Sequence, residues 1–149
     1  MKNLESNLEN YLLEHIPISK AIGVKVDVAS LEKVVLEAPF INNINHKQTV
    51  FGGSLHAVAT LSCWSLLHVN LKSLGEDVQI VIASSKIEYL APVSQDFKAI
   101  CCQPDNETWQ FFLKVLNKKR KARVKLQAKI FQNDKLCVDY SGTFVAIKT

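Results

Sequence analysis

The spacing of apolar residues along the chain separates two helices of very different character. Residues 3–14 place leucine and tyrosine at helical intervals between polar residues, which predicts an amphipathic helix. Residues 53–73 are apolar on nearly every side, and no Asp, Glu, Lys or Arg occurs from Gln48 to Leu71. A helix that is apolar all round must be wrapped by other elements of the fold.

The charge-free run is too polar for a membrane span. Hydrocarbon would leave its polar side chains unsatisfied, namely Gln48, Thr49, Ser54, His56, Thr60, Ser62, Ser65, His68 and Asn70. We therefore expect a helix buried inside a folded protein, with no membrane as a partner.

Strand patterns flank this central helix on both sides. Before it, valines alternate with charged residues over 24–28, and an apolar run over 33–38 follows a short turn. A polar, asparagine-rich loop then spans residues 39–50. After the helix, the pattern predicts four strands, over residues 78–90, 96–102, 121–131 and 137–147. A short helix over 104–116 interrupts them, with Asp105 or Asn106 as its cap, and Asn133–Asp134 predicts a hairpin turn.

These elements predict an α+β fold, in which one curved antiparallel sheet wraps around one long buried helix. The strands after the helix carry one polar face, as expected for a sheet that is packed on one side. The chain contains no repeat, low-complexity segment or linker, so we expect a single domain over residues 1–149.

Composition narrows the location and the partners. The formal net charge of +4 is modest, so the overall charge does not indicate nucleic acid or an anionic membrane as a partner. The N-terminal stretch is polar and amphipathic, which is unlike a signal peptide. The cysteines Cys63, Cys101, Cys102 and Cys137 lack zinc-site spacing, and we expect reduced thiols in a cytoplasmic protein without a metal.

Three segments in this order resemble the hotdog fold of the acyl-CoA thioesterase superfamily. The first is Asn45 followed by Phe51-Gly52-Gly53 and a helix of small residues, similar to N-x-x-G-x-x-H-G-G. The second is K-I-E-Y-L-A-P-V-S-Q-D-F-K-A over residues 86–99. The third is the terminal pair R-V-K-L-Q-A-K-I-F and Y-S-G-T-F-V-A-I. The F-G-G-S-L variant and Trp64 resemble more closely the thioesterase domain that some bacteria carry fused behind an acetyltransferase.

The glycine pair suggests a site for a carbonyl group. The first N–H groups of a helix have no partner within the helix and lie at the positive end of its dipole. Gly52 and Gly53 lack the Cβ atoms that would keep a ligand away. A thioester carbonyl could rest against these N–H groups, which would stabilise the negative charge that develops during hydrolysis. The alternative is that the glycines only allow close packing of the helix against the sheet.

Hydrolysis also needs a group that positions or activates water. In the thioesterases that the chain resembles, an Asn ahead of the glycine pair and a carboxylate seven residues after it do this. Asn45 matches the first position, whereas Thr60 stands at the second and has no useful basicity. His46, beside Asn45, and His56, one turn into the helix, are candidate bases, as is Glu88. His56 is also a candidate substrate-binding residue. The alternatives are that His46 is simply an exposed loop residue and that His56 is hydrogen-bonded in the protein interior without a catalytic role.

Two further features are candidates for substrate binding. Residues 118–123 hold five basic side chains, including Lys119, Arg120 and Arg123, which could bind the phosphates of coenzyme A or be a solvated turn. No aromatic residues are interleaved with them, so nucleic acid is not favoured. Ser84 and Ser85 interrupt an apolar strand and could hydrogen-bond a substrate or lie on the polar face.

The resemblance implies hydrolysis of an acyl-CoA or acyl carrier protein thioester, with coenzyme A only as part of the substrate and no other cofactor. It also implies a homodimer or a dimer of dimers, with Asn45 of one subunit facing Thr60 of the other. Because a carboxylate is missing at position 60, a non-catalytic acyl-CoA binding module is the alternative. A hotdog dehydratase is disfavoured, since it would require an acidic residue on the helix.

Overall fold

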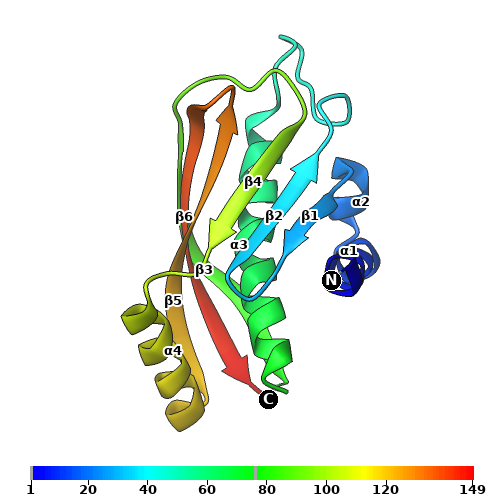
Figure 1. The fold of residues 1–149 in the computed structure, drawn as a ribbon. Helices are drawn as coiled ribbons and strands as arrows, with labels where there is room; N and C mark the ends of the chain where they lie inside the picture. Colours follow the sequence, from blue (N-terminus) through cyan, green and yellow to red (C-terminus); the bar gives the residue numbers. More distant parts are fainter. Residues whose placement is uncertain (1, 76) are drawn as a thin grey trace.

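One six-stranded antiparallel sheet curls around one long helix (Figure 1). The computed structural model describes residues 2–75 and 77–149. The strand order in the sheet is β1-β2-β4-β5-β6-β3, and the helix at its centre is α3 (Gly52–Ser73). The strands are β1 (Lys25–Ala29), β2 (Lys33–Ala38), β3 (Val78–Tyr89), β4 (Phe97–Cys102), β5 (Lys121–Gln132) and β6 (Lys135–Lys148). The predicted α+β hotdog arrangement is therefore confirmed.

The central helix is buried because the sheet surrounds most of it. Val58, Ala59 and Leu66 have no exposed surface, and α3 contacts β2, β3, β4, β5 and β6. Small and apolar side chains let the strands approach the helix from several directions, which the charge-free sequence requires. None of the helices in the described residues is long and apolar enough to cross a membrane.

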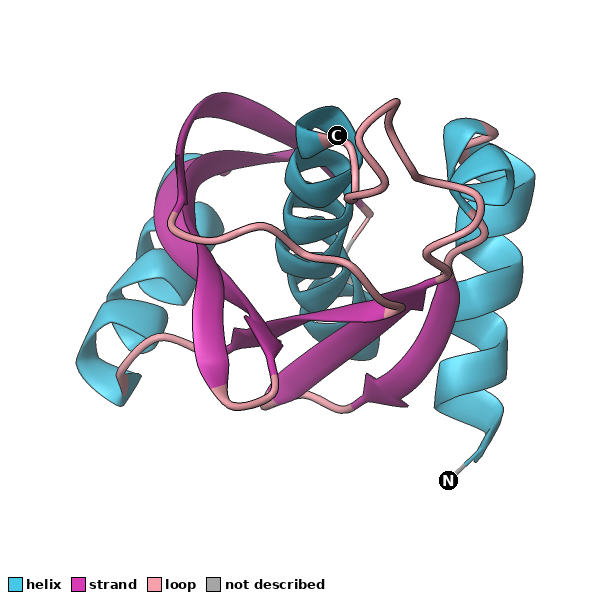
Figure 2. Cartoon of the chain, turned by 90° about the horizontal axis from the view of Figure 1, so that it is seen from above, coloured by secondary structure: helices cyan, strands magenta, loops and turns pink. Residues whose placement is uncertain are grey.

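The two edges of the sheet differ sharply. At the β1 edge lies α1 (Lys2–His15), seen on the right of Figure 2, which corresponds to the predicted first helix. The backbone N–H groups of Val26 and Ala29 donate to the carboxylates of Glu9 and Glu5, at 2.8 and 3.1 Å. The bond from Ala29 lowers the pKa of Glu5. These carboxylates satisfy edge groups that would otherwise invite pairing with another strand.

The β3 edge is less covered among the described residues, where the Trp64 indole N–H donates to the Ile80 carbonyl at 3.2 Å. β3 is 12 residues long and pairs only with β6. Its apolar residues Val81, Ile82 and Tyr89 are 46%, 43% and 51% exposed. A long, apolar, unpaired edge is a site at which another strand can add.

The fourth helix closes a gap in the sheet. β4 and β5 pair over only three residue pairs, from Ala99↔Ile130 to Cys101↔Ala128. Beyond that point α4 (Asn106–Lys119) packs against β5 and buries Trp109, Phe112 and Leu116. Of the two predicted caps, Asp105 is the one used, and its carboxylate accepts a hydrogen bond from the Thr108 N–H at 2.8 Å.

A hairpin turn and a short helix lie between the longer elements of the fold. The hairpin turn is confirmed, since Asn133 and Asp134 both have positive φ, 51° and 66°. The short helix α2 (Ile18–Ile22) was not predicted. It is a single turn that ends at Gly23, whose φ of 82° suits glycine.

A stack of rings joins α1 to α3. The Tyr11 ring lies 4.4 Å from that of His68 and 6.0 Å from that of Trp64, and the Trp64 and His68 rings stack at 4.9 Å. Burial lowers the pKa of His68 to about 4, with further contributions from Lys72 and His15. The folded protein therefore holds His68 neutral in a pH range in which an unfolded chain would protonate it.

Replacing Phe112 with Ala will destabilise the fold by about 3–5 kcal/mol, because the ring is buried where α4 seals the sheet. Phe111→Ala is the matched control, since this neighbouring ring is 68% exposed and its loss will change stability by less than about 0.5 kcal/mol. Urea unfolding of both variants measures the difference. Equal losses of stability would contradict the position assigned to α4.

Stability will fall as the pH is lowered from 6.5 towards 4, in part because of His68. Its folded pKa lies below its unfolded value, so the unfolded state binds the proton first and gains stability in that window. His68→Gln will reduce this acid sensitivity, because the variant has no imidazole to protonate at this position. The check is the urea midpoint of each protein across the window, and parallel curves for wild type and His68→Gln would refute the assignment.

Candidate active site at the start of the central helix

The start of α3 presents two free N–H groups. Phe51 is the N-terminal cap, and its carbonyl accepts hydrogen bonds from the N–H groups of Ser54 and Leu55 at 2.9 and 3.2 Å. The N–H groups of Gly52 and Gly53 have no hydrogen-bond partner in the part of the chain that the structure describes. Both point from the positive end of a helix 22 residues long, where an oxygen with negative charge is favoured.

The second glycine also lies close to the exposed ring of Phe51. A Cβ atom on Gly53 would lie 2.3 Å from the Phe51 ring, so that ring would have to move. A Cβ atom on Gly52 would lie 3.4 Å from the Tyr89 ring, whose hydroxyl donates to the Gly52 carbonyl at 3.0 Å. Tyr89 therefore fixes the first turn of α3 against the last residue of β3.

One turn further along α3, four side chains form a connected polar cluster. His56 Nε2 lies 3.0 Å from Ser85 Oγ on β3. The Thr60 hydroxyl lies 2.9 Å from the His56 carbonyl and 2.9 Å from the Tyr140 hydroxyl on β6. When Thr60 donates to the carbonyl, Tyr140 donates to Thr60, which satisfies both hydroxyls.

Tyr140 is the residue of this cluster that the sequence did not reveal. Burial is the main reason that its pKa rises to about 12, so its hydroxyl remains a hydrogen-bond donor at neutral pH. The His56 ring lies 5.6 Å from the Tyr140 ring, edge to face. Gly142 leaves room for the hydroxyl, since a Cβ atom there would lie 2.7 Å from it. The signal was present in the alternation of the last strand, which places Tyr140 on the inner face.

The two serines of β3 lie on opposite faces of the sheet. A bulge between Ile82 and Ser84 shifts the register, so Ser85 pairs with Gly142 and faces α3. Neighbouring residues of a strand point to opposite faces, so Ser84 and Glu88 face away from the cluster. The structure brings Ser85 to His56 and places Ser84 outside the site.

Asn45 and His46 lie in the loop before α3. The Asn45 side chain accepts hydrogen bonds from the N–H groups of Lys47 and Thr49, and donates to the Thr49 hydroxyl at 2.8 Å. These bonds shape the loop, and His46 is exposed beside it. Within one chain, no hydrogen bond joins either residue to His56 or Thr60 among the described contacts.

The basic residues lie at the other end of the molecule. Arg120 donates to the Thr149 carbonyl at 3.1 Å, and the Thr149 N–H donates to the Asp77 carbonyl at 3.3 Å. Asp77 follows the C-terminal end of α3, which is roughly 30 Å from its first residue at 1.5 Å per residue. Lys119, Arg120 and Arg123 are therefore far from the glycine pair of the same chain.

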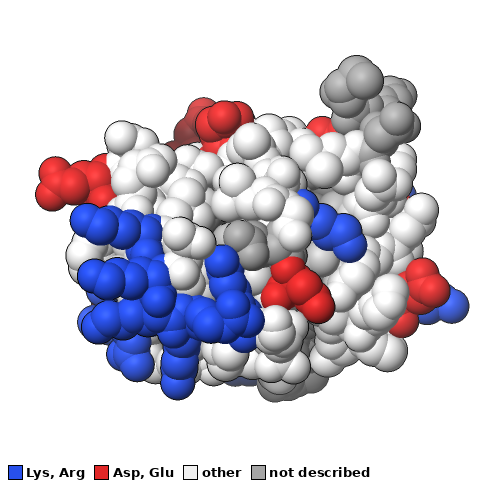
Figure 3. Space-filling model, turned by 90° about the horizontal axis from the view of Figure 1, so that it is seen from below, with Lys and Arg blue, Asp and Glu red and all other residues white. Residues whose placement is uncertain are grey.

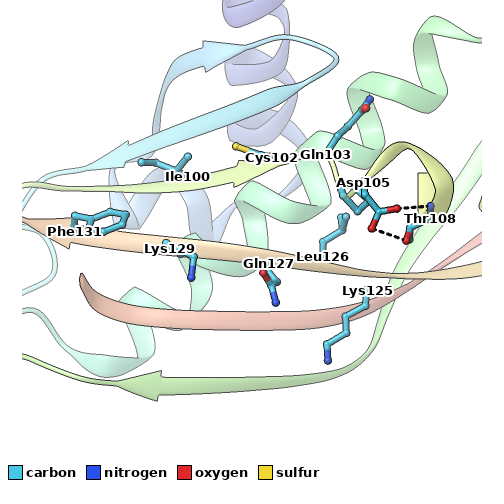
Figure 4. A pocket seen from close by; sticks show the side chains of 11 residues that line it. Ile100, Cys102, Gln103, Asp105, Thr108, Lys125, Leu126, Gln127, Lys129 and Phe131 are labelled. Atoms are coloured by element: carbon cyan, nitrogen blue, oxygen red, sulfur yellow. Dashed lines mark hydrogen bonds between the residues drawn. The ribbon is translucent and has the colours of Figure 1, made fainter. Parts of the chain in front are cut away.

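A separate cavity lies between β4, β5 and the start of α4 (Figure 4). It has a volume of about 520 Å³, and Lys125, Lys129 and Phe131 are among its lining residues. Asp105 points to Thr108 there and is occupied in capping α4. No group of three or more metal-ligating side chains occurs among the described residues.

Comparison with known proteins places this geometry in a family. Residues 5–148 match the model of the family described as "Putative thioesterase (yiiD_Cterm)". A Chlorobaculum tepidum protein of unknown function is 29% identical, with a TM-score of 0.94 over 99% of this chain and 96% of that one.

Two solved structures described as thioesterases share the fold. A "putative thioesterase" of Shewanella oneidensis is 30% identical, with a TM-score of 0.88 over 99% of both chains. A Haemophilus influenzae thioesterase is 15% identical, with a TM-score of 0.74 over 97% of this chain and 90% of that one, and shows likeness of fold alone. Because the family model spans nearly the whole sequence, the chain belongs to the YiiD_C thioesterase family of hotdog proteins.

Proposed function

We propose that this protein hydrolyses the thioester bond of an acyl-CoA or acyl carrier protein substrate at the start of α3. The observation that carries the proposal is the pair of unpartnered N–H groups of Gly52 and Gly53, one turn from the polar cluster of His56 and Thr60. Membership of a thioesterase family supports the same reaction.

The glycine N–H groups hold the thioester carbonyl oxygen. Water attacks the carbonyl carbon, and the electron pair of the C=O bond moves onto this oxygen. The N–H groups and the helix dipole stabilise the negative charge, and one such donor is worth about 2.7–4 kcal/mol of barrier in other enzymes. The oxygen then reforms the double bond, the C–S bond breaks, and the sulfur leaves as a thiol when it receives the proton that the water lost.

A histidine carries that proton from the water to the sulfur. With Nε2 of His56 protonated and donating to Ser85, its Nδ1 bears the lone pair that can accept the proton. His46 is the second candidate base, from the loop of the other subunit. Asn45 with His46 or Thr60 positions the water, and Asn45 of one subunit faces Thr60 of the other.

The active form is a homodimer, alone or within a dimer of dimers. The carboxylates of Glu5 and Glu9 cover the β1 edge of the sheet, whereas the outer edge of β3, which is 12 residues long, pairs with no strand of the described residues. A second copy can pair its own β3 with this edge in antiparallel fashion about a two-fold axis. The same contact would cover the half-buried outer face of α3, which includes Ala57 and Trp64.

The protein acts in the cytoplasm and without a metal or other cofactor. Its cysteines are all unpaired thiols, which suits a reducing compartment. The proposed chemistry needs only N–H donors, a histidine and water. Nucleic acid and membrane have no role in it.

A non-catalytic acyl-CoA binding module is the second candidate function. The observation that favours it is Thr60, a hydroxyl without basicity, which is engaged with the His56 carbonyl and Tyr140. Such a protein would keep the carbonyl site and lack turnover.

The purified protein will release free thiol from at least one member of a panel of short, long and aromatic acyl-CoAs. His56→Ala will lower kcat by about 10²–10⁴-fold with little change in KM, because it removes the base and leaves the carbonyl site intact. His15→Ala, on the exposed end of α1, is the control and will keep wild-type kcat. Saturable binding of acyl-CoAs without any thiol release would replace hydrolysis with the binding module.

Ile82→Asp will convert the dimer into a monomer, because it places a charge at the centre of the pairing edge. Ile18→Asp makes the same chemical change at a residue that is 60% exposed on α2, beside the opposite edge of the sheet, and will leave the dimer intact. Light scattering after gel filtration gives the mass of each. A monomeric wild-type protein, or a dimeric Ile82→Asp variant, would rule out pairing through β3.

A further inference from the structure

The sheet splits between β4 and β5, and the cavity of about 520 Å³ lies at this split. The last position at which the two strands pair is Cys101↔Ala128. Beyond it β4 stays with the β2 side of the sheet, since the Gln103 N–H donates to the Glu32 carbonyl at 2.8 Å. Pro104 follows and has no N–H to offer β5. The ladder therefore ends there, and the first turn of α4 leaves the space beside β5 unfilled.

The cavity opens on the outer face of β5, which is turned away from α3. Exposed and buried residues alternate along this strand. Lys125, Gln127 and Phe131 are exposed, whereas Leu126 and Ala128 are buried. A ligand in the cavity would therefore contact the side chains of the outer face, and the layer packed on α3 would remain covered.

This cavity is far from the glycine pair of its own chain. The side-chain amide of Gln103, one of the lining residues, donates to Asn70 Oδ1 of α3 at 2.9 Å. Asn70 is roughly 25 Å from Gly53 along the helix, at about 1.5 Å per residue. In the sheet, β6 lies between β5 and the β3 edge. The cavity is thus separate both from the proposed thioester site of the chain and from the proposed dimer contact.

Several polar groups of the lining are already hydrogen-bonded within the fold. The Asp105 carboxylate accepts hydrogen bonds from the N–H and the hydroxyl of Thr108, at 2.8 and 3.1 Å. The Gln103 amide also donates to the Leu31 carbonyl at 2.7 Å. A sugar or a nucleotide, which needs many hydrogen-bonding partners, would find few of them here.

Lys125 is the cation of the lining that is left for a ligand. The other lysine, Lys129, lies 3.5 Å from the carboxylate of Asp139. The side chains of Lys125 and Gln127 form no salt bridge or hydrogen bond within the part of the chain that the structure describes. One ammonium group suits a ligand with one negative charge, and the neighbouring Asp105 carboxylate disfavours a second.

The charge around the cavity also favours an anion. Lys and Arg gather on one side of the end of the molecule shown in Figure 3, where α4 ends and β5 begins. Lys121 and Arg123 precede Lys125 on the same exposed face of β5. Positive charge of this kind raises the local concentration of anions.

The lining is long, and the end opposite to Lys125 is apolar. Phe131 and Ile100 lie at one end of the cavity and Lys125 lies at the other (Figure 4). Phe131 and Lys125 are about 20 Å apart along β5, at about 3.3 Å per residue. The volume falls within the range of about 300–1,000 Å³ that is usual for small-molecule pockets. This shape matches a slender apolar ligand with a negative charge at one end.

We propose that this cavity binds an unbranched fatty acid, with its carboxylate on Lys125 and its chain directed towards Ile100 and Phe131. The Gln127 side-chain amide donates a second hydrogen bond to the carboxylate. This second site differs from the proposed thioester site in its position and in its ligand. Its occupation does not require hydrolysis of a thioester.

The first test removes the cation and measures binding by calorimetry with decanoate as the probe. Decanoate will bind the wild-type protein saturably, with one molecule per chain. Lys125→Met keeps an unbranched side chain without charge and will weaken binding by about tenfold. Lys25→Met makes the same change at an exposed position on β1, at the opposite edge of the sheet, and will keep the wild-type Kd. Equal Kd values for these two variants would overturn the proposal.

The second test changes the ligand. Decanol keeps the chain and lacks the carboxylate, so it will bind wild type about tenfold more weakly than decanoate. It will not distinguish wild type from Lys125→Met. Acetate, which lacks the chain, will not bind saturably. Equal affinities of wild type for decanol and decanoate would contradict the contact with Lys125.

The third test locates the ligand through Cys102. This residue lines the cavity and is exposed, whereas the thiols of Cys63, Cys101 and Cys137 are buried. Decanoate will slow the alkylation of Cys102 by iodoacetamide in proportion to the occupied fraction of the cavity, as measured by mass spectrometry. Gln127→Trp, which places an indole ring in the cavity from an exposed position, will abolish this protection. Saturable binding that leaves the alkylation rate unchanged would place decanoate elsewhere, including the glycine pair, and would overturn the proposal. Absence of saturable binding would also overturn it.

Discussion

Removal of the apolar helix α3 from water is the constraint on which the rest of this structure depends. From Gln48 to Leu71 no charged side chain can face solvent, so strands must approach the helix from several sides. A sheet that curls enough to do this leaves an opening between its edges, and α4 fills a second gap where β4 and β5 separate. In this arrangement the first turn of α3 is only partly covered, and Gly53 of the glycine pair is exposed.

The difference between the two sheet edges is the basis of the proposed dimer. Glu5 and Glu9 satisfy N–H groups of β1, so this edge is closed by the chain itself. On β3 the Trp64 indole N–H donates to the Ile80 carbonyl, no second strand pairs with the outer edge in the described residues, and Val81, Ile82 and Tyr89 are exposed. The face of α3 that carries Gly53, His56 and Thr60 lies beside that open edge. The proposed dimer contact and the proposed site of hydrolysis therefore lie at the same surface. A substitution there is expected to affect both dimer formation and hydrolysis.

Most of the fold could be predicted from the sequence, because the spacing of apolar residues and the local composition determine the type of each helix, strand and turn. The alternation over β5, the turn at Asn133–Asp134 and the apolar α3 are all strong local patterns. The choice of Asp105 over Asn106 as cap was not decided, because both residue types can accept the same hydrogen bond. The single turn of α2 was missed because five residues are too few to show a helical period.

The site was predictable only in part, because its contacts join distant segments. The glycine pair at the start of a helix is a local signal, and the free N–H groups follow from it. The hydrogen bond between Thr60 and Tyr140 spans 80 residues, and no local pattern indicates it. The bulge after Ile82 decides that Ser85 and not Ser84 faces His56, and strict alternation would have predicted the opposite. The distance of the basic residues from the glycine pair likewise depends on the topology of the sheet.

The central claim is that the N–H groups of Gly52 and Gly53 hold the carbonyl oxygen of a thioester. The most direct measurement is an NMR titration of the ¹⁵N-labelled protein with a CoA thioether ketone, a non-hydrolysable analogue of the thioester. The titration follows the signals of the backbone amides. The account predicts downfield shifts of the Gly52 and Gly53 amide protons and slower exchange of both with solvent. Saturable binding that leaves these two amides unchanged while shifting others would contradict it.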